Sequence, residues 1–318
     1  MGRGPSRARS LTRDEACQAM RLILSGDAAP EAIGALLMLM RYRGETAEEL
    51  AGFTDAARGR LDGWRHIGAA LDWPSYAAGR SRGRPFFLLA AKLVAEAGFP
   101  VLLHGWNSHQ NSIADVRGAL ADLDIPLVGD AAAAKTSLAS TGIAYAPLDA
   151  VDPKLLELLK LRDVLGLRSA VNTVCRMLNP GRSNTAVQGV FHPSYRDLQQ
   201  DAAKLLELTD MIVIKGGGGE FERHPAKDVS LFGLRKGEAY RATAPAALSD
   251  HRRLAEPPTG SLPLALLWAG EVSDPFAESI ITGTCGAALF ALGAGASIET
   301  CDRRARELWS SRHRKLVA

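Results

Sequence analysis

The chain has 318 residues, of which 47% are hydrophobic and 23% charged, and its formal net charge is +3. This composition is ordinary for a folded globular protein and excludes a disordered or collagen-like chain. No apolar run is long enough to span a bilayer, and the arginine-rich start has no apolar segment behind it. We therefore expect no membrane association, no secretory signal and a cytoplasmic location.

The first part of the chain is predicted to be helical. Thr12–Glu15 and Thr46–Glu49 each place a threonine three residues before a glutamate, which is the pattern of a capping box at a helix start. Between them, Pro30 suits the first turn of another helix, and Gly44 suits its end. Three helices are therefore expected before about residue 60.

The apolar stripes of these helices are narrow. Ile33, Leu37 and Met40 follow one another at helical spacing. Such stripes must be buried against each other or against a partner chain. We expect a homodimer that forms through these residues and their neighbours.

Strands and helices alternate beyond residue 71. Apolar runs predict buried strands, and longer periodic runs predict helices. We expect strands at 100–105, 143–146, 187–191 and 211–214, helices at 85–97, 112–122, 152–162, 193–208, 275–292 and 297–313, and a loop at 242–263. This order predicts an α/β fold with a mostly parallel sheet covered on both faces. The expected domains are a helical domain over 1–70, completed by helical segments near 160–182, and an α/β domain over 71–318.

The four cysteines, Cys17, Cys175, Cys285 and Cys301, are far apart and form no CxxC pair. They are predicted to be reduced thiols and not zinc ligands or disulfides.

Positive charge gathers in three places: the N-terminal arm, the region near residue 80 and the C-terminus. Basic clusters on a near-neutral body favour a polyanionic partner, with solvated surface charge as the alternative.

Three segments carry residues that suit ligand chemistry. His104, with the polar residues after it, follows a predicted strand, and ligands of α/β sheets bind beyond the carboxyl ends of strands. The run Gly216–Glu222 has four glycines and two acids that could hold Mg²⁺, or it is a plain turn. Arg162 and Arg168 could bind one anion together if a bend at Gly166 brings them close.

Several stretches resemble one known family. They are Leu161–Thr173, Phe86–Leu120 with its His104-Gly105-Trp106-Asn107, and Gly286–Glu299. With the helical start, they are similar to anthranilate phosphoribosyltransferases over nearly the whole chain. The resemblance implies a small helical domain on a large α/β domain of the nucleoside phosphorylase and phosphoribosyltransferase type. It also implies a homodimer formed through the helical domain.

The opening of the chain resembles one branch of this family. Gly2-Arg3-Gly4, Arg13–Ala16 and Phe191–Tyr195 are similar to YbiB-type proteins, which bind DNA. The resemblance implies a homodimer that binds DNA or another nucleic acid. The arginines expected to contact phosphates are Arg3, Arg7, Arg9, Arg80, Arg82 and Arg84.

The family's motifs for phosphoribosyl pyrophosphate are altered here. The glycine-rich loop that cradles the diphosphate matches Pro74–Arg80, in which Gly79 is the one glycine. The lysine of the family's Lys-His-Gly-Asn is replaced by Leu103, and Trp106 is inserted before the asparagine. The adjacent acids that position Mg²⁺ become Glu220-Phe221-Glu222, while Arg162 matches an arginine that binds the anthranilate carboxylate.

The sequence therefore predicts a nucleic-acid-binding protein with a vestigial ligand pocket, no catalytic residues and no cofactor. The alternative is a glycosyl or phosphoribosyl transferase that would need Mg²⁺ at Glu220 and Glu222. The pocket residues are Gly79, His104, Gly105, Asn107, Ser112 and Arg162.

Overall fold

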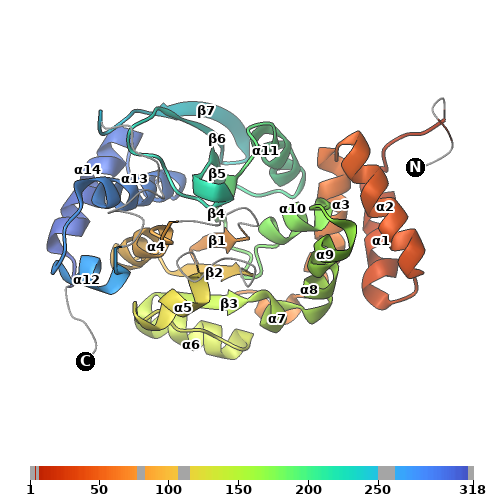
Figure 1. Cartoon of the computed structure of the whole chain (residues 1–318), viewed down its shortest axis with the longest axis horizontal. Helices are drawn as coiled ribbons and strands as arrows, with labels where there is room; N and C mark the ends of the chain where they lie inside the picture. Colours follow the sequence, from red (N-terminus) through yellow and green to blue (C-terminus); the bar gives the residue numbers. More distant parts are fainter. Residues whose placement is uncertain (1–3, 5–6, 77–82, 107–114, 250–261, 314–318) are drawn as a thin grey trace.

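The computed structural model describes residues 4, 7–76, 83–106, 115–249 and 262–313 (Figure 1). A sheet of seven strands in the order β3-β2-β1-β4-β5-β6-β7 lies between layers of helices. The first five strands run parallel, and the last two are antiparallel additions at one edge. The strands are β1 (Leu71–Ser75), β2 (Val101–Gly105), β3 (Ile143–Pro147), β4 (Thr185–Val190), β5 (Asp210–Lys215), β6 (Val229–Arg235) and β7 (Glu238–Ala244).

The predicted N-terminal helices are present as α1 (Arg13–Ser25), α2 (Pro30–Arg43) and α3 (Ala47–Arg58). Both capping boxes form, because the hydroxyls of Thr12 and Thr46 accept from the main-chain N–H of Glu15 and Glu49. Figure 1 shows α8 (Pro153–Lys160), α9 (Arg162–Leu165) and α10 (Ala170–Arg176) beside these helices. The helical part is thus built from two segments of the chain.

The remaining helices cover the sheet or connect its strands. They are α4 (Phe87–Glu96), α5 (Val116–Ala121), α6 (Ala131–Thr141), α7 (Leu148–Val151), α11 (Tyr195–Leu205), α12 (Leu264–Ala269), α13 (Pro275–Ala291), α14 (Ile298–Ser311), and the short 3₁₀ helices η1 (Asp62–Trp64) and η2 (Gly217–Gly219).

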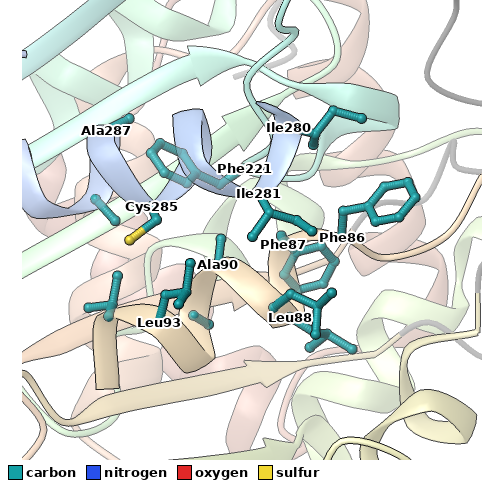
Figure 2. Close-up of a cluster of buried hydrophobic side chains, with 14 of the residues drawn as sticks. Phe86, Phe87, Leu88, Ala90, Leu93, Phe221, Ile280, Ile281, Cys285 and Ala287 are labelled. Carbon is teal, nitrogen blue, oxygen red and sulfur yellow. The ribbon is translucent and has the colours of Figure 1, made fainter. Parts of the chain in front are cut away.

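Two separate hydrophobic cores lie on the two faces of the sheet. Successive strand side chains point to opposite faces, so Ile212 enters the core beneath α4 and α13, while Met211 and Val213 enter the core shared with the helical part. Figure 2 shows Phe87 and Phe221 in the first core, between α4 and α13. Both faces of the central strands are buried, which is why these strands read as continuous apolar runs.

The α/β class and the mostly parallel sheet are confirmed, and two parts of the sheet were not foreseen. Strand β1 contains Asp72 and Pro74, which hide its apolar pattern. Strands β6 and β7 form a hairpin whose two turn residues, Lys236 and Gly237, both have positive φ (52° and 80°), as a type I′ turn requires. Because β7 extends to Ala244, the predicted loop at 242–263 begins later than expected, and residues 250–261 lie outside the described part.

Two of the three residues named for the predicted dimer contact are buried within the chain. Leu37 and Met40 are 1% and 0% exposed, so these two side chains cannot make the predicted contact, and Ile33 is partly buried against the same core. The exposed apolar side chains of α2 are Met38, Leu39 and Tyr42, the last 90% exposed. A homodimer contact on α2 would therefore use the face that carries Met38, Leu39 and Tyr42.

No helix among the described residues is long and apolar enough to cross a membrane. Cys175, Cys285 and Cys301 are buried free thiols and Cys17 is partly exposed.

Candidate functional site

A buried chain of three polar side chains connects β1 and the residue after it to β2. His104 is fully buried, with its Nδ1 atom 2.9 Å from the hydroxyl of Tyr76 and its Nε2 atom 3.2 Å from a carboxylate oxygen of Asp72. When the Tyr76 hydroxyl donates to Nδ1, the ring proton sits on Nε2 and faces Asp72. Burial raises the pKa of Tyr76 well above its usual value, so this hydroxyl remains a proton donor. His104 of β2 thus connects the two strands β1 and β2 through buried polar contacts.

Gly105 serves close packing in the described structure. A Cβ atom added at Gly105 would lie 2.0 Å from the carbonyl oxygen of Ser75 on the neighbouring strand. Only glycine permits that approach. The other predicted pocket residues of this region, Gly79, Asn107 and Ser112, lie outside the described residues.

The two acids predicted to hold Mg²⁺ face the protein interior. Glu220 accepts from the Ser75 hydroxyl at 3.0 Å, and Glu222 accepts from the main-chain N–H of Phe87, at the start of α4, at 3.0 Å. The two carboxylates are 1% and 0% exposed. Phe221 between them packs edge-on against Trp73 in the core, with ring centroids 5.4 Å apart, and so holds the acids apart.

These carboxylates do not fit a magnesium centre. Both are occupied by protein donors, and no group of three or more acidic, histidine or cysteine side chains in the described part of the chain could hold a metal ion. Mg²⁺ prefers octahedral sites that keep several water molecules, which these buried side chains do not offer.

An arginine-rich cleft of about 380 Å³ opens between the helical part and the α/β part. Its walls come from the end of α2, the α9–α10 segment, the carboxyl end of β4 and the first turns of α11. We call it the arginine cleft; it is lined by Arg41, Arg162, Asp163, Gly166, Leu167, Arg168, Ser169, Asn172, Thr173, Arg176, Val190, Phe191, His192, Tyr195 and Gln199.

The chain bends at Gly166, which has a φ of 69°, and both Arg162 and Arg168 line the cleft. Burial, with Arg162 and Arg41 nearby, lowers the pKa of Arg168. The one lining acid, Asp163, is exposed and its carboxylate lies 3.9 Å from Arg162. Crowded like charges in a half-buried site favour an anion.

Two lining side chains have polar atoms without a hydrogen-bonding partner among the described residues. The Nη1 atom of Arg162 is buried and makes no hydrogen bond. Gln199 is 1% exposed, and neither its amide oxygen nor its amide nitrogen has a partner. Buried polar groups are nearly always satisfied, by protein, water or ligand. Gln199 carries no sequence signal of a site, because an isolated glutamine on a helix is ordinary.

The cleft's other charged groups are already positioned by the protein. Arg176, on the floor, donates to the Asn172 side chain at 2.7 Å and to the Tyr76 carbonyl at 2.9 Å. Arg41 donates to the Tyr195 hydroxyl at 2.7 Å, which in turn donates to Glu45 at 3.0 Å. Burial and Glu45 raise the pKa of Tyr195 to about 12, so it stays neutral.

Of the arginines predicted to bind nucleic acid, the three that the structure describes, Arg7, Arg9 and Arg84, do not form one patch. Arg9 is exposed, but its guanidinium grips Glu15 through two bonds of 2.6 Å, which lowers the pKa of Glu15 to about 2. Arg7 is exposed on the same arm, whereas Arg84 is half-buried before α4, and Figure 1 places these two segments well apart. Arg3, Arg80 and Arg82 lie outside the described residues.

Comparisons with known proteins agree with this fold. Residues 3–60 match the glycosyl transferase family, helical bundle domain. The anthranilate phosphoribosyltransferase of Geobacillus kaustophilus is 27% identical over 297 residues, covering 91% of this chain and 87% of the relative. That of Rhizobium rhizogenes is 32% identical over 209 residues, covering 65% of this chain and 61% of the relative.

Solved structures give the same result. The crystal structure of the Thermus thermophilus anthranilate phosphoribosyltransferase has a TM-score of 0.75 at 25% identity, with 95% of this chain and 92% of that chain covered. This chain is anthranilate phosphoribosyltransferase-like in sequence and in fold. The Saccharomyces cerevisiae enzyme in complex with PRPP and Mg has a TM-score of 0.76 at 15% identity, covering 95% and 90%, and this likeness concerns the fold.

The chain thus has the fold of those enzymes, and its arginine cleft lies at the carboxyl end of β4. Its strand ends are filled by its own side chains, Tyr76 against His104 and Ser75 against Glu220. The arginine cleft is thus open, whereas the described carboxyl ends of β1 and β2 are occupied by the chain's own side chains.

Proposed function

We propose that this chain is a glycosyltransferase-type protein whose arginine cleft binds a small aromatic acid of the anthranilate class. The observation that carries the proposal is the set of unsatisfied donors in the cleft, Arg162 Nη1 and the Gln199 amide, beside the half-buried Arg168. A carboxylate accepts from arginine in a paired geometry, and an aromatic amine offers the Gln199 amide oxygen a donor. The relatives named anthranilate phosphoribosyltransferases support this class of ligand.

We further infer that the sugar donor is not phosphoribosyl pyrophosphate. The place of the family's glycine-rich loop begins with Ser75 and Tyr76, whose side chains are buried in contacts with Glu220 and His104. Glu220 and Glu222 are themselves occupied. These four side chains are therefore engaged with the protein and are not positioned to hold a diphosphate or its metal ion.

Binding of aromatic acids is expected to depend on the carboxylate and on Arg162. In isothermal titration calorimetry, anthranilate and benzoate should bind, and aniline, which lacks the carboxylate, should not. Arg162→Gln should raise the dissociation constant for anthranilate about tenfold or more, because it removes a hydrogen bond between charged groups.

The matched control is Arg241→Gln, since Arg241 is exposed, pairs with Asp197 on the surface and lies outside the cleft. Anthranilate binding that is equal in the parent and in Arg162→Gln would refute the assignment of this cleft.

Nucleic-acid binding is the second candidate, and one observation favours it. Phe191 is 46% exposed at the mouth of the cleft, with the Arg168 guanidinium 5.8 Å from its ring and His192 edge-on beside it at 4.9 Å. An exposed ring next to cations suits a stacked base and its phosphate. Because Arg9 is paired with Glu15, we place the main nucleic-acid contact at the cleft mouth and expect a weaker contribution from the N-terminal arm.

Fluorescence anisotropy with a labelled single-stranded oligonucleotide at low salt tests this candidate. Phe191→Ala should weaken binding by about 1–3 kcal/mol through lost stacking. The combined Arg3→Ala, Arg7→Ala and Arg9→Ala variant should weaken it less and flatten the salt dependence by about 0.7 per lost contact. If the arm variant loses binding while Phe191→Ala binds as the parent does, the arm is the contact. If no variant or parent binds at low salt, this candidate function is wrong.

A further inference from the structure

A second cleft rich in arginine lies at the other end of the strands. It has a volume of about 490 Å³ and follows the amino ends of β1, β4 and β5, whereas the arginine cleft lies at the carboxyl end of β4. We call it the rear cleft; it is lined by Arg13, Asp55, Arg58, Gly59, Arg65, His66, Asn179, Arg182, Ser183, Asn184, Leu206, Glu207, Leu208 and Thr209. The two clefts share no lining residue.

Arg58 is the most deeply placed charge of the rear cleft. It is 8% exposed, and its Nε and Nη2 atoms donate to the carbonyls of Leu178 and Met177 at 2.9 Å each. Its Nη1 atom makes no hydrogen bond to a described residue, and no described carboxylate lies within ion-pair distance of the guanidinium. Burial, and next the nearby Arg182, lower its pKa to about 10. A buried cation without an ion pair is costly, and the carboxylates of Asp72 and Asp55, which raise the pKa of Arg58, offset only part of that cost.

Arg182 adds a second cation that has no ion-pair partner in the described structure. Its Nη2 atom donates to the Arg58 carbonyl at 3.1 Å, so its other donors remain available. Its backbone has a φ of 54°, which is uncommon for a residue other than glycine. The turn is held by Asn179, whose amide exchanges two hydrogen bonds with the main chain of Ser183, at 2.9 Å and 2.7 Å. The protein thus fixes where Arg182 stands.

The remaining charges of the rear cleft are largely balanced in pairs. Arg13 binds Asp55 at 2.7 Å, and Arg65 binds Asp62 at 3.0 Å. Glu207 is exposed and acts on Arg13 from a distance. Arg58 and Arg182 are therefore the two arginines of the rear cleft without an ion-pair partner among the described residues, and the exposed His66 also lines it.

We propose that the rear cleft is a binding site for a small phosphate monoester. Arginine forks match the oxygens of a phosphate, and a dianion would offset the two unbalanced guanidinium groups. The cleft is larger than a phosphate group alone and falls within the usual size range of ligand sites, so it leaves room for the esterified part. This site is separate from the arginine cleft and does not depend on the function proposed for it.

Calorimetric titration of the full chain with inorganic phosphate and with ribose 5-phosphate tests the proposal. Both probes should bind the parent protein. Arg182→Asn, chosen because asparagine tolerates a positive φ, should weaken both by about tenfold or more. Arg65 also lines the cleft and lies near enough to Arg182 to lower its pKa, so Arg65→Gln should weaken ribose 5-phosphate several-fold; this second variant, at an exposed side chain, separates the loss of a cation from a folding defect of Arg182→Asn. Arg168→Gln in the arginine cleft and Arg241→Gln on the surface should leave the binding of both probes at the rear cleft unchanged.

Three results would overturn the proposal. The first is loss of all phosphate binding in Arg168→Gln, because the anion would then belong to the arginine cleft. The second is parental affinity in both Arg182→Asn and Arg65→Gln. The third is an absence of saturable binding of ribose 5-phosphate to the parent, whether or not inorganic phosphate binds.

Discussion

Purified protein supplied with anthranilate, phosphoribosyl pyrophosphate and Mg²⁺ is expected to form product at least about a thousandfold more slowly than a known anthranilate phosphoribosyltransferase assayed beside it. Removing one positioned donor from an active site typically costs a factor of about 10²–10³ in rate. Here Glu220 and Glu222, which the resemblance implies would position Mg²⁺, are buried against Ser75 and the start of α4, and Leu103 stands where the resemblance implies a lysine. Chromatography of the product over time provides the measurement.

Binding and turnover separate the two parts of the proposed function. Anthranilate should still bind in the arginine cleft of the protein that fails to turn it over, and Arg162→Gln should remove that binding. Turnover at a rate comparable to the known enzyme would show that the donor inference is wrong while leaving the assignment of the cleft in place. A protein that binds neither anthranilate nor phosphoribosyl pyrophosphate would leave nucleic-acid binding as the better candidate.

Asp302→Ala is expected to lower the free energy of unfolding by about 3–5 kcal/mol, because it leaves a buried charge without its partner. Arg223 donates to both carboxylate oxygens of Asp302 at 2.8 Å, which joins the segment after β5 to α14. The side chains are 3% and 12% exposed. Chemical denaturation followed by circular dichroism measures the change.

Removing the other partner, by Arg223→Met, should lower the free energy of unfolding by less. Burial raises the pKa of Asp302, and Arg223 opposes that rise. Without Arg223 the carboxyl group can take up a proton and become neutral, whereas an arginine left alone stays charged. Arg241→Gln, which breaks an exposed pair, should change stability by less than about 1 kcal/mol. Equal losses for Asp302→Ala and Arg241→Gln would contradict this account of the buried pair.

Local signals in the sequence predicted local structure well. The capping boxes placed the starts of α1 and α3, because each box is formed by residues three apart. Strand β1 escaped notice, since Pro74 and Asp72 interrupt its apolar run and only the neighbouring strands make it a strand. The sequence could not separate the two apolar faces of α2, of which one is buried at Leu37 and the other exposed at Tyr42.

The site was harder to predict than the fold, because a sequence does not show whether a charged side chain is free or paired with another one. Arg9 reads as a free cation until the fold of the arm places it on Glu15. Arg162 and Arg168 were considered together, and the bend at Gly166 that this required is present. Gln199 and Arg58 have no sequence signal. Gln199 is marked by a buried amide without a hydrogen bond, and Arg58 by a buried guanidinium without an ion pair, and both are visible only in the fold.

The helical part of this protein is assembled from residues far apart in the chain, and this has a consequence for its synthesis. Helices α1 to α3 are complete at Arg58, but α10, which contributes to the same core, ends only at Arg176. At a ribosomal rate of about 5–20 residues per second, the apolar faces of the first helices wait on the order of ten seconds for their partner. During that interval the nascent chain offers an unfinished apolar surface, which is what chaperones bind, and a stop within the intervening segment would leave that surface permanently open.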